Sequence, residues 1–258
     1  MTIQALVIGI GSGNPEHLTR EAVAALNRVD VFLAADKGVA KHDLVTLREE
    51  ICRALIRHDH YRFVEVPDPD RGPDRERDAA DYQTGVAAWH EARAQRYAEI
   101  IAAEVGDGDT VGFLVWGDPA FYDSTIRIVQ SISKCGIDLE LTVIPGISSI
   151  QLLAARHKII LNRIGRPIHV PTGLRLLEEY SPDLGDVVVM LDGDLACGGL
   201  IERFGDLTIY WGAQLGLHDE TLVSGCLSDV IAEIQAKRAA LREARGWVMD
   251  TYLLRPAE

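Results

Sequence analysis

The stretch IQALVIGI at residues 3–10, with the glycine-rich turn GSGN at residues 11–14, decides the fold class. Its unbroken run of branched apolar residues is typical of a strand buried on both faces of a parallel sheet. Apolar residues at helical spacing follow between residues 18 and 29, and Pro15 and Thr19 are suitable start signals for that helix. The chain is therefore predicted to open with a strand, a tight turn and a helix, which is the basic unit of an α/β fold.

The same alternation of strands and helices continues through the first half of the chain. Further strands are predicted at residues 31–35, 61–66, 110–116 and 139–144, and a long helix is predicted at residues 82–104. Strands that alternate with helices favour a parallel sheet, here one of five strands. Ligands of such sheets bind beyond the carboxyl ends of the strands.

The pair Pro145-Gly146 interrupts this pattern, and we place a domain boundary there. The prediction is an N-terminal α/β domain at residues 1–144 and a C-terminal α/β domain at residues 147–258 with a mixed sheet. Strands of the second domain are expected near Ile168 and at residues 187–191, 207–211 and 247–254, with a closing helix at 227–245.

Composition excludes several classes of protein. The formal net charge of −13 disfavours a nucleic-acid-binding protein, because such proteins grip phosphates with Lys and Arg. No apolar stretch reaches the roughly 20 residues of a membrane span, and no leader segment is visible, so we expect a cytoplasmic protein that contacts no membrane. The four cysteines lie far apart without a CxxC pair, so reduced and mostly buried thiols are expected.

The first glycine turn, Gly9-Ile10-Gly11-Ser12-Gly13-Asn14, allows three interpretations. A dinucleotide fingerprint GxGxxG would need a third glycine where Asn14 stands, and an acidic residue earlier than Asp36 at the end of the second strand. A purely structural turn is the second interpretation. The third is an active-site turn of another α/β family.

Two later turns follow strands in the same way. Gly117-Asp118-Pro119 comes directly after VGFLVW, and a glycine there lets the backbone approach a ligand while the aspartate offers an acceptor. Pro145-Gly146 is followed by Ser148 and Ser149, which open a helix whose free amide groups suit a carboxylate. Each turn alone could be a structural Asx or capping turn, but their succession predicts a binding edge.

Taken in order, these segments resemble the tetrapyrrole methylase family. The motifs that carry the resemblance are VIGIGSGNPEHLTREAVAALNRVDVFL, FLVWGDPAFY, TVIPGISSIQLLA, VVVML and LHDETLVSG, and they span nearly the whole chain. The segments DKGVAKHDLVTLREEIC and WHEARAQRYAEII resemble the branch that methylates precorrin-5. The resemblance implies two α/β domains that bind S-adenosylmethionine in the cleft between them, and it implies a homodimer.

The resemblance also implies a set of cofactor-binding residues at the motif positions. Trp116, Gly117 and Asp118 would line the methionine and ribose side with Phe121 beside them, while Ser148 and Ser149 would hydrogen-bond the cofactor. Leu191 would pack on adenine, and Ala213 to Leu215 would complete the adenine site. The segment Ala213-Gln214-Leu215-Gly216 departs from the pattern that relatives commonly show there, and Ser12 replaces a common proline.

The activity implied is methylation of precorrin-5 at carbon 1 of the macrocycle, with loss of the extruded acetyl group as acetate and S-adenosylhomocysteine as the second product. Methyl transfer from a sulfonium needs alignment and a dry site more than acid-base groups. Release of acetate needs water and a possible base, for which Asp118 and Asp36 are candidates, but no catalytic residue is assigned. No metal is needed, and His58-Asp59-His60 lacks a third ligand.

The substrate carries several carboxylates, which Arg holds well by paired hydrogen bonds. The candidates are Lys37, Lys41, Arg93, Arg127, Arg163 and Arg166. Other hypotheses remain open at this point. Within the same fold the acceptor could be another tetrapyrrole, a protein residue or an RNA ribose. From different classes, the chain could be a nicotinamide-dependent oxidoreductase or a non-catalytic tetrapyrrole carrier.

Overall fold

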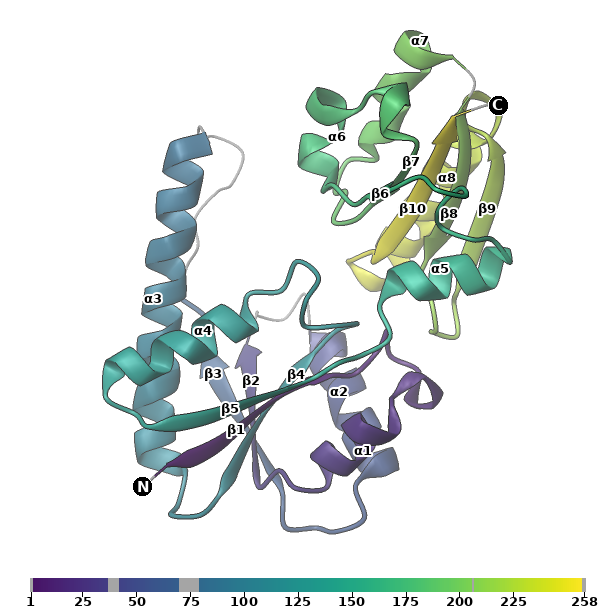
Figure 1. Cartoon of the computed structure of the whole chain (residues 1–258). Helices are drawn as coiled ribbons and strands as arrows, with labels where there is room; N and C mark the ends of the chain where they lie inside the picture. Colours follow the sequence, from purple (N-terminus) through teal and green to yellow (C-terminus); the bar gives the residue numbers. More distant parts are fainter. Residues whose placement is uncertain (1, 37–41, 70–78, 206, 257–258) are drawn as a thin grey trace. The chain divides into compact units, whose positions relative to one another are not determined.

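A computed structural model of the chain describes residues 2–36, 42–69, 79–205 and 207–256. The chain divides into two compact units, Met1–Ile147 and Ser148–Glu258, and each is described by itself (Figure 1). The first contains a five-stranded parallel sheet and the second a five-stranded mixed sheet, so the predicted α/β class with these two kinds of sheet is confirmed.

The first unit alternates strands and helices along the chain. Its elements are β1 (Ile3–Gly9), α1 (Arg20–Leu26), β2 (Val31–Asp36), α2 (His42–Leu55), β3 (Arg62–Pro67), α3 (Ala79–Glu104), β4 (Thr110–Val115), α4 (Thr125–Ile132) and β5 (Leu139–Ile144). All neighbouring strands are parallel, in the order β3-β2-β4-β1-β5. Strand β1 therefore lies between β4 and β5, and the turns after β4, β1 and β5 are neighbours at one edge.

The unbroken apolar run of β1 is explained by burial on both faces of the sheet. Ala5 and Val7 belong to a core cluster that includes α3 and α4, while Leu6 and Ile8 belong to a second cluster with α1 and α2. Figure 1 shows these helix pairs on opposite faces of the sheet. Successive side chains of a strand point to opposite faces, so a strand covered on both sides must be apolar throughout.

The second unit continues from the helix that follows Pro145-Gly146. Its elements are α5 (Ser149–His157), β6 (Ile168–His169), α6 (Gly173–Glu179), β7 (Asp186–Val189), α7 (Ile201–Phe204), β8 (Leu207–Ala213), β9 (Thr221–Cys226), α8 (Leu227–Arg245) and β10 (Asp250–Pro256). The sheet order is β6-β7-β10-β8-β9, and β10 runs antiparallel to both β7 and β8. Trp211 and Tyr252 are the largest fully buried side chains of its core.

Most predicted elements agree with the structure, and the differences lie at boundaries, at one edge strand and at the short helices α6 and α7, which were not predicted. Strand β5 and helix α8 have the predicted bounds, and Thr19 caps α1 by accepting from the Ala22 amide at 3.0 Å. The last strand begins at Asp250, three residues after its predicted start. Strand β9 was not predicted, because Val223 is its one buried residue and the strand ends in Ser224-Gly225-Cys226.

All four cysteines are described and are thiols rather than disulfides, as expected, but only two of them are buried. Burial raises the pKa of the Cys52 and Cys197 thiols to about 12, while Cys135 and Cys226 are partly exposed. Of the described helices, none combines the length and apolarity that crossing a membrane requires.

Thiol reactivity should follow this division. At pH 8 we expect Ellman's reagent to modify Cys135 and Cys226 in the native protein and to reach Cys52 and Cys197 only on unfolding, because the thiolate is the nucleophile and a pKa of about 12 leaves roughly one part in ten thousand ionised. Peptide mapping after timed labelling measures this. Fast native labelling of Cys52 would contradict the packing of α2 described here.

Candidate functional site

Three turns of the first unit meet at the carboxyl edge of its sheet. The turn after β1 pairs with the turn after β4, since Gly117 N–H donates to Gly11 O at 2.7 Å and Gly11 N–H donates to Gly117 O at 3.3 Å. Both β4 and β5 flank β1 in the sheet. The edge where ligands of parallel sheets bind is therefore formed by these three turns.

Glycines at this edge are required because the three backbones touch. A Cβ on Gly146 would lie 2.0 Å from Gly117 O, and a Cβ on Gly9 would lie 2.6 Å from Gly146 N. Gly117 also has a φ of +64°, in the left-handed region that favours glycine. The three residues Gly9, Gly117 and Gly146 form what we call the glycine cluster. Its demand for glycine comes from backbone packing rather than from a dinucleotide fingerprint.

Asp118 holds the same turns together through its carboxylate. One oxygen accepts from Ala120 N–H at 2.8 Å and the other accepts from Gly146 N–H at 2.9 Å. The side chain thus closes its own turn and ties it to the turn after β5. Both oxygens are engaged by backbone amides, which is the structural role that the sequence left open for this residue.

The other two predicted residues of this turn face different surroundings. The Trp116 ring is partly buried against the core cluster that contains α1 and α2, and the Arg48 guanidinium lies 5.0 Å from its ring centroid. The Phe121 side chain is 39% exposed on the turn after β4. Trp116 is therefore fixed by packing, while Phe121 is available to a ligand.

Ser148 and Ser149 begin helix α5 of the second unit. Ser148 is buried, and the Gln151 side-chain oxygen accepts from its amide at 2.8 Å and from its hydroxyl. This reciprocal pattern resembles a capping box and uses the Ser148 hydroxyl within the helix start. Ser149 is partly exposed, so its hydroxyl is the more accessible of the two.

Leu191 stands at the end of β7 in an unusual conformation. It is 63% exposed and has a φ of +52°, which costs a non-glycine residue about 1–2 kcal/mol. The next residue, Asp192, is buried and accepts from Ala196 N–H at 2.7 Å and from the Tyr252 hydroxyl. A Cβ on Gly173 would collide with Asp192, so α6 also packs on it. Asp192 therefore anchors the turn that presents Leu191.

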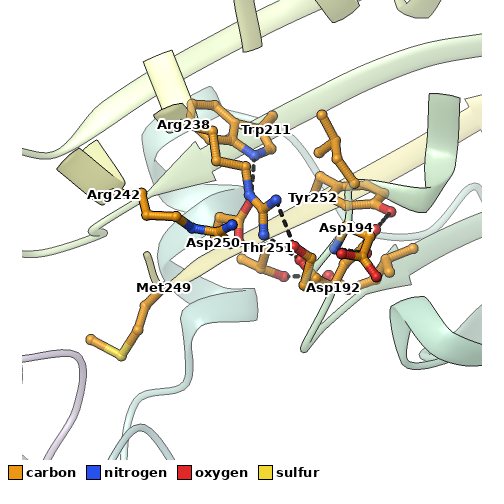
Figure 2. Close-up of polar contacts among 12 residues, drawn as sticks. Asp192, Asp194, Trp211, Arg238, Arg242, Met249, Asp250, Thr251 and Tyr252 are labelled. Atoms are coloured by element: carbon orange, nitrogen blue, oxygen red, sulfur yellow. Dashed lines mark hydrogen bonds and ion pairs between the residues drawn. The ribbon is translucent and has the colours of Figure 1, made fainter. Parts of the chain in front are cut away.

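Arg238 of α8 secures this turn from the other side (Figure 2). It donates to Gly193 O at 2.9 Å and to Asp192 O, and its Nε lies 3.0 Å from an Asp250 oxygen. The same Asp250 oxygen accepts from Trp211 Nε1 at 2.9 Å. Burial raises the pKa of Asp250, although Arg238 and Trp211 oppose the shift. These groups form one connected network around the Leu191 turn.

The structure places the side chains of Ala213 and Leu215 in the interior, where they do not present a surface. Ala213 is fully buried and Leu215 is 4% exposed, packed where Gly212 has no side chain. Gln214 between them has a φ of +52° and a buried Nε2 without a hydrogen-bond partner in the described part of the chain. All three residues of this turn are buried as whole residues, so neither their side chains nor their backbone forms an exposed surface.

The basic candidates differ in how they are paired. Arg93 lies 2.9 Å from Asp68 and Arg163 lies 3.5 Å from Asp186, so carboxylates already face both cations. Arg127 and Arg166 are exposed, while Lys37, Lys41 and the Asp36 side chain lie outside the described residues. Within the described ranges, His, Cys, Asp and Glu form no group of three that could hold a metal ion.

The hydroxyl of Tyr252 should be worth a measurable share of the stability. We expect Tyr252→Phe to lower the free energy of unfolding by about 1.5–3 kcal/mol, because it removes a buried hydrogen bond to the Asp192 carboxylate. Tyr180→Phe is the matched control, since the Tyr180 hydroxyl is buried without a partner among the described residues. Urea unfolding should show the control unchanged or slightly more stable, and equal losses in both variants would contradict the network.

Comparisons with known proteins agree with this architecture. The profile of the Tetrapyrrole (Corrin/Porphyrin) Methylases matches residues 5–231. A protein of Sinorhizobium sp. named precorrin-6A synthase [deacetylating] is 43% identical over 253 residues, which cover 97% of this chain and 94% of that one.

Solved structures show the same fold. A cobalamin-synthesis-related protein (CobF) of Corynebacterium diphtheriae is 35% identical, with a TM-score of 0.83 and full coverage of both chains. A uroporphyrin-III C-methyl transferase of Thermus thermophilus, solved with S-adenosyl homocysteine, has a TM-score of 0.57 at 18% identity and covers 98% of this chain and 97% of its own. The chain belongs to the tetrapyrrole (corrin/porphyrin) methylase family, whose members are S-adenosylmethionine-dependent methyltransferases.

Proposed function

We propose that this enzyme methylates precorrin-5 at carbon 1 with S-adenosylmethionine and releases acetate, giving precorrin-6A. The observation that carries the proposal is identity of 43% along 97% of the chain to a relative named precorrin-6A synthase [deacetylating]. The exposed side chains of Leu191 and Phe121, both at motif positions, support a site for a methyl donor.

Nine residues are proposed to serve the methyl donor, in two different ways. Some contribute exposed side chains, namely Phe121, Ser149 and Leu191, of which Leu191 would pack on the adenine ring. The remainder act through backbone groups or by holding the turns in place, and they are Trp116, Gly117, Asp118, Ser148, Ala213 and Leu215. Ala213 and Leu215 are buried as whole residues, so the role proposed for both is to hold their turn in place.

Methyl transfer from S-adenosylmethionine does not require these residues to act as general acids or bases. S-adenosylmethionine supplies a methyl group on a positively charged sulfur, and the carbon nucleophile of the macrocycle displaces S-adenosylhomocysteine in line. The chain aligns the two partners and keeps water from the methyl group. Loss of acetate then needs water at the acetyl carbonyl, so that the bond to the ring breaks and acetate leaves. Asp118 is held by two amides and is not proposed as the base for that step.

The setting of the reaction is also part of the proposal. We place the enzyme in the cytoplasm as a homodimer that acts without a nucleic acid or a membrane. The net charge of −13 supports the absence of a nucleic-acid partner, because phosphate backbones attract basic surfaces.

The products test the proposed reaction directly. Under anaerobic conditions with precorrin-5 and methyl-labelled S-adenosylmethionine, mass spectrometry should show one labelled methyl group in the macrocycle and one acetate released per turnover. Methylation without acetate would exclude the deacetylating reaction and leave a methyltransferase of another step. Absence of any methylated tetrapyrrole would contradict the proposed function as a whole.

Leu191 tests the proposed adenine contact. We expect Leu191→Ala to weaken binding of S-adenosylhomocysteine about 5- to 30-fold, since roughly 1–2 kcal/mol of apolar contact is lost. Its stability should stay within about 0.5 kcal/mol of the wild type, because the side chain is exposed. Leu174→Ala, which changes another exposed leucine of the second unit, is the control for calorimetric titration. Equal affinities of both variants would remove Leu191 from the proposed site.

A further inference from the structure

A cavity of about 140 Å³ lies inside the first unit, apart from the glycine cluster. Residues of β2, β3, β4, α2 and α3 line it, together with Trp116 and Asp123 of the segment after β4 and Thr125 at the start of α4. Sites for drug-sized ligands measure roughly 300–1,000 Å³. This cavity is therefore too small for a macrocycle but large enough for one short polar side arm.

Arg48 of α2 is a cation of this cavity for which the described residues supply no ion-pair partner. Its Nε lies 3.4 Å from Leu114 O and its Nη1 lies 3.2 Å from Leu44 O, so two backbone carbonyls orient the guanidinium. Its guanidinium carbon lies 5.0 Å from the Trp116 ring centroid. Among the described residues, no Asp or Glu oxygen lies within the 4.0 Å of an ion pair with it.

The other charged groups of the cavity are already engaged. Arg93 lies 2.9 Å from Asp68, and its guanidinium stacks 4.7 Å from the Trp89 ring. Asp123 is exposed at the end of the segment before α4, and its carboxylate accepts from Thr125 N–H at 2.7 Å. Arg48 is half-buried and makes no ion pair with the described residues, although the nearby Asp123 charge raises its pKa against the effect of burial.

Such a charge is unfavourable unless an anion joins it. Burial lowers the pKa of Arg48 to about 10, which still leaves the group charged at neutral pH. Removing a charge from water is costly, and an unpaired buried charge is rare unless it meets a ligand. The Arg48 guanidinium is oriented by two carbonyls and flanked by the Trp116 indole, so its remaining N–H groups are in a fixed position to donate two parallel hydrogen bonds to a carboxylate.

We propose that Arg48 binds one peripheral carboxylate of the tetrapyrrole substrate in this cavity, beside the Trp116 ring. The proposal rests on the proposed function for the identity of the substrate and adds the residue that recognises one of its acidic arms. It also gives a reason for the bulky Trp116 directly before Gly117: the ring forms a wall of the carboxylate pocket while the glycine packs in the cluster.

The test separates the two substrates kinetically. With precorrin-5 under anaerobic conditions, Arg48→Met should raise the KM for precorrin-5 at least tenfold and leave the KM for S-adenosylmethionine within twofold. Its thermal midpoint should not fall, because the variant removes a half-buried charge that makes no ion pair with the described residues. Arg48→Lys should give an intermediate KM, since it restores the charge without the fork. Arg53→Met, which changes an exposed arginine of the same helix, is the matched control.

Two results would overturn the proposal while the proposed function stands. The first is an unchanged KM for precorrin-5 in Arg48→Met. The second is a rise in the KM for S-adenosylmethionine equal to the rise in the KM for precorrin-5, in both the Met and the Lys variant, which would indicate a structural role for Arg48. Should Arg48→Met not fold, the Lys variant decides by the same KM comparison. Failure of the wild-type protein to methylate precorrin-5 would instead overturn the proposed function, and this proposal with it.

Discussion

The contact on which the first unit depends is the backbone packing of Gly9, Gly117 and Gly146. A side chain at Gly146 would place its Cβ 2.0 Å from Gly117 O, so the turns after β1, β4 and β5 can meet only because side chains are missing there. Asp118 then joins two of these turns by accepting from Gly146 N–H. A parallel sheet delivers its ligand-binding turns to one edge, and this contact fixes their positions relative to one another.

In the second unit, polar side chains rather than glycine backbones hold the turn of a predicted site residue in place. Leu191 is exposed in a left-handed conformation, a combination that a stable fold retains only when its surroundings fix the backbone. Asp192, Arg238 and Asp250 supply that fixation through buried hydrogen bonds and an ion pair (Figure 2). In both units, then, the residues nearest the proposed methyl donor are held by polar or backbone contacts that carry no substrate chemistry themselves.

The sequence predicted the strands and turns that depend on local residue patterns, and it missed the side-chain contacts that depend on residues distant in the chain. Apolar runs predicted the five strands of the first sheet, but β9 carries no such run, since Val223 is its one buried residue. The motif positions named Asp118 and Ser148 without showing that Gly146 and Gln151 occupy their side chains. The local sequence of its helix does not distinguish Arg48 from other arginines, because only the fold brings Trp116 close to it. An aspartate directly after VVVML was the one visible signal for the Asp192 network.

The central claim is that the glycine turns serve a methyl donor and not a dinucleotide. Isothermal titration of the wild-type protein with S-adenosylhomocysteine and, separately, with NADH tests it most directly. We expect a saturable heat of binding with S-adenosylhomocysteine, at one molecule per chain, and no heat of binding with NADH. Binding of NADH without binding of S-adenosylhomocysteine would contradict it.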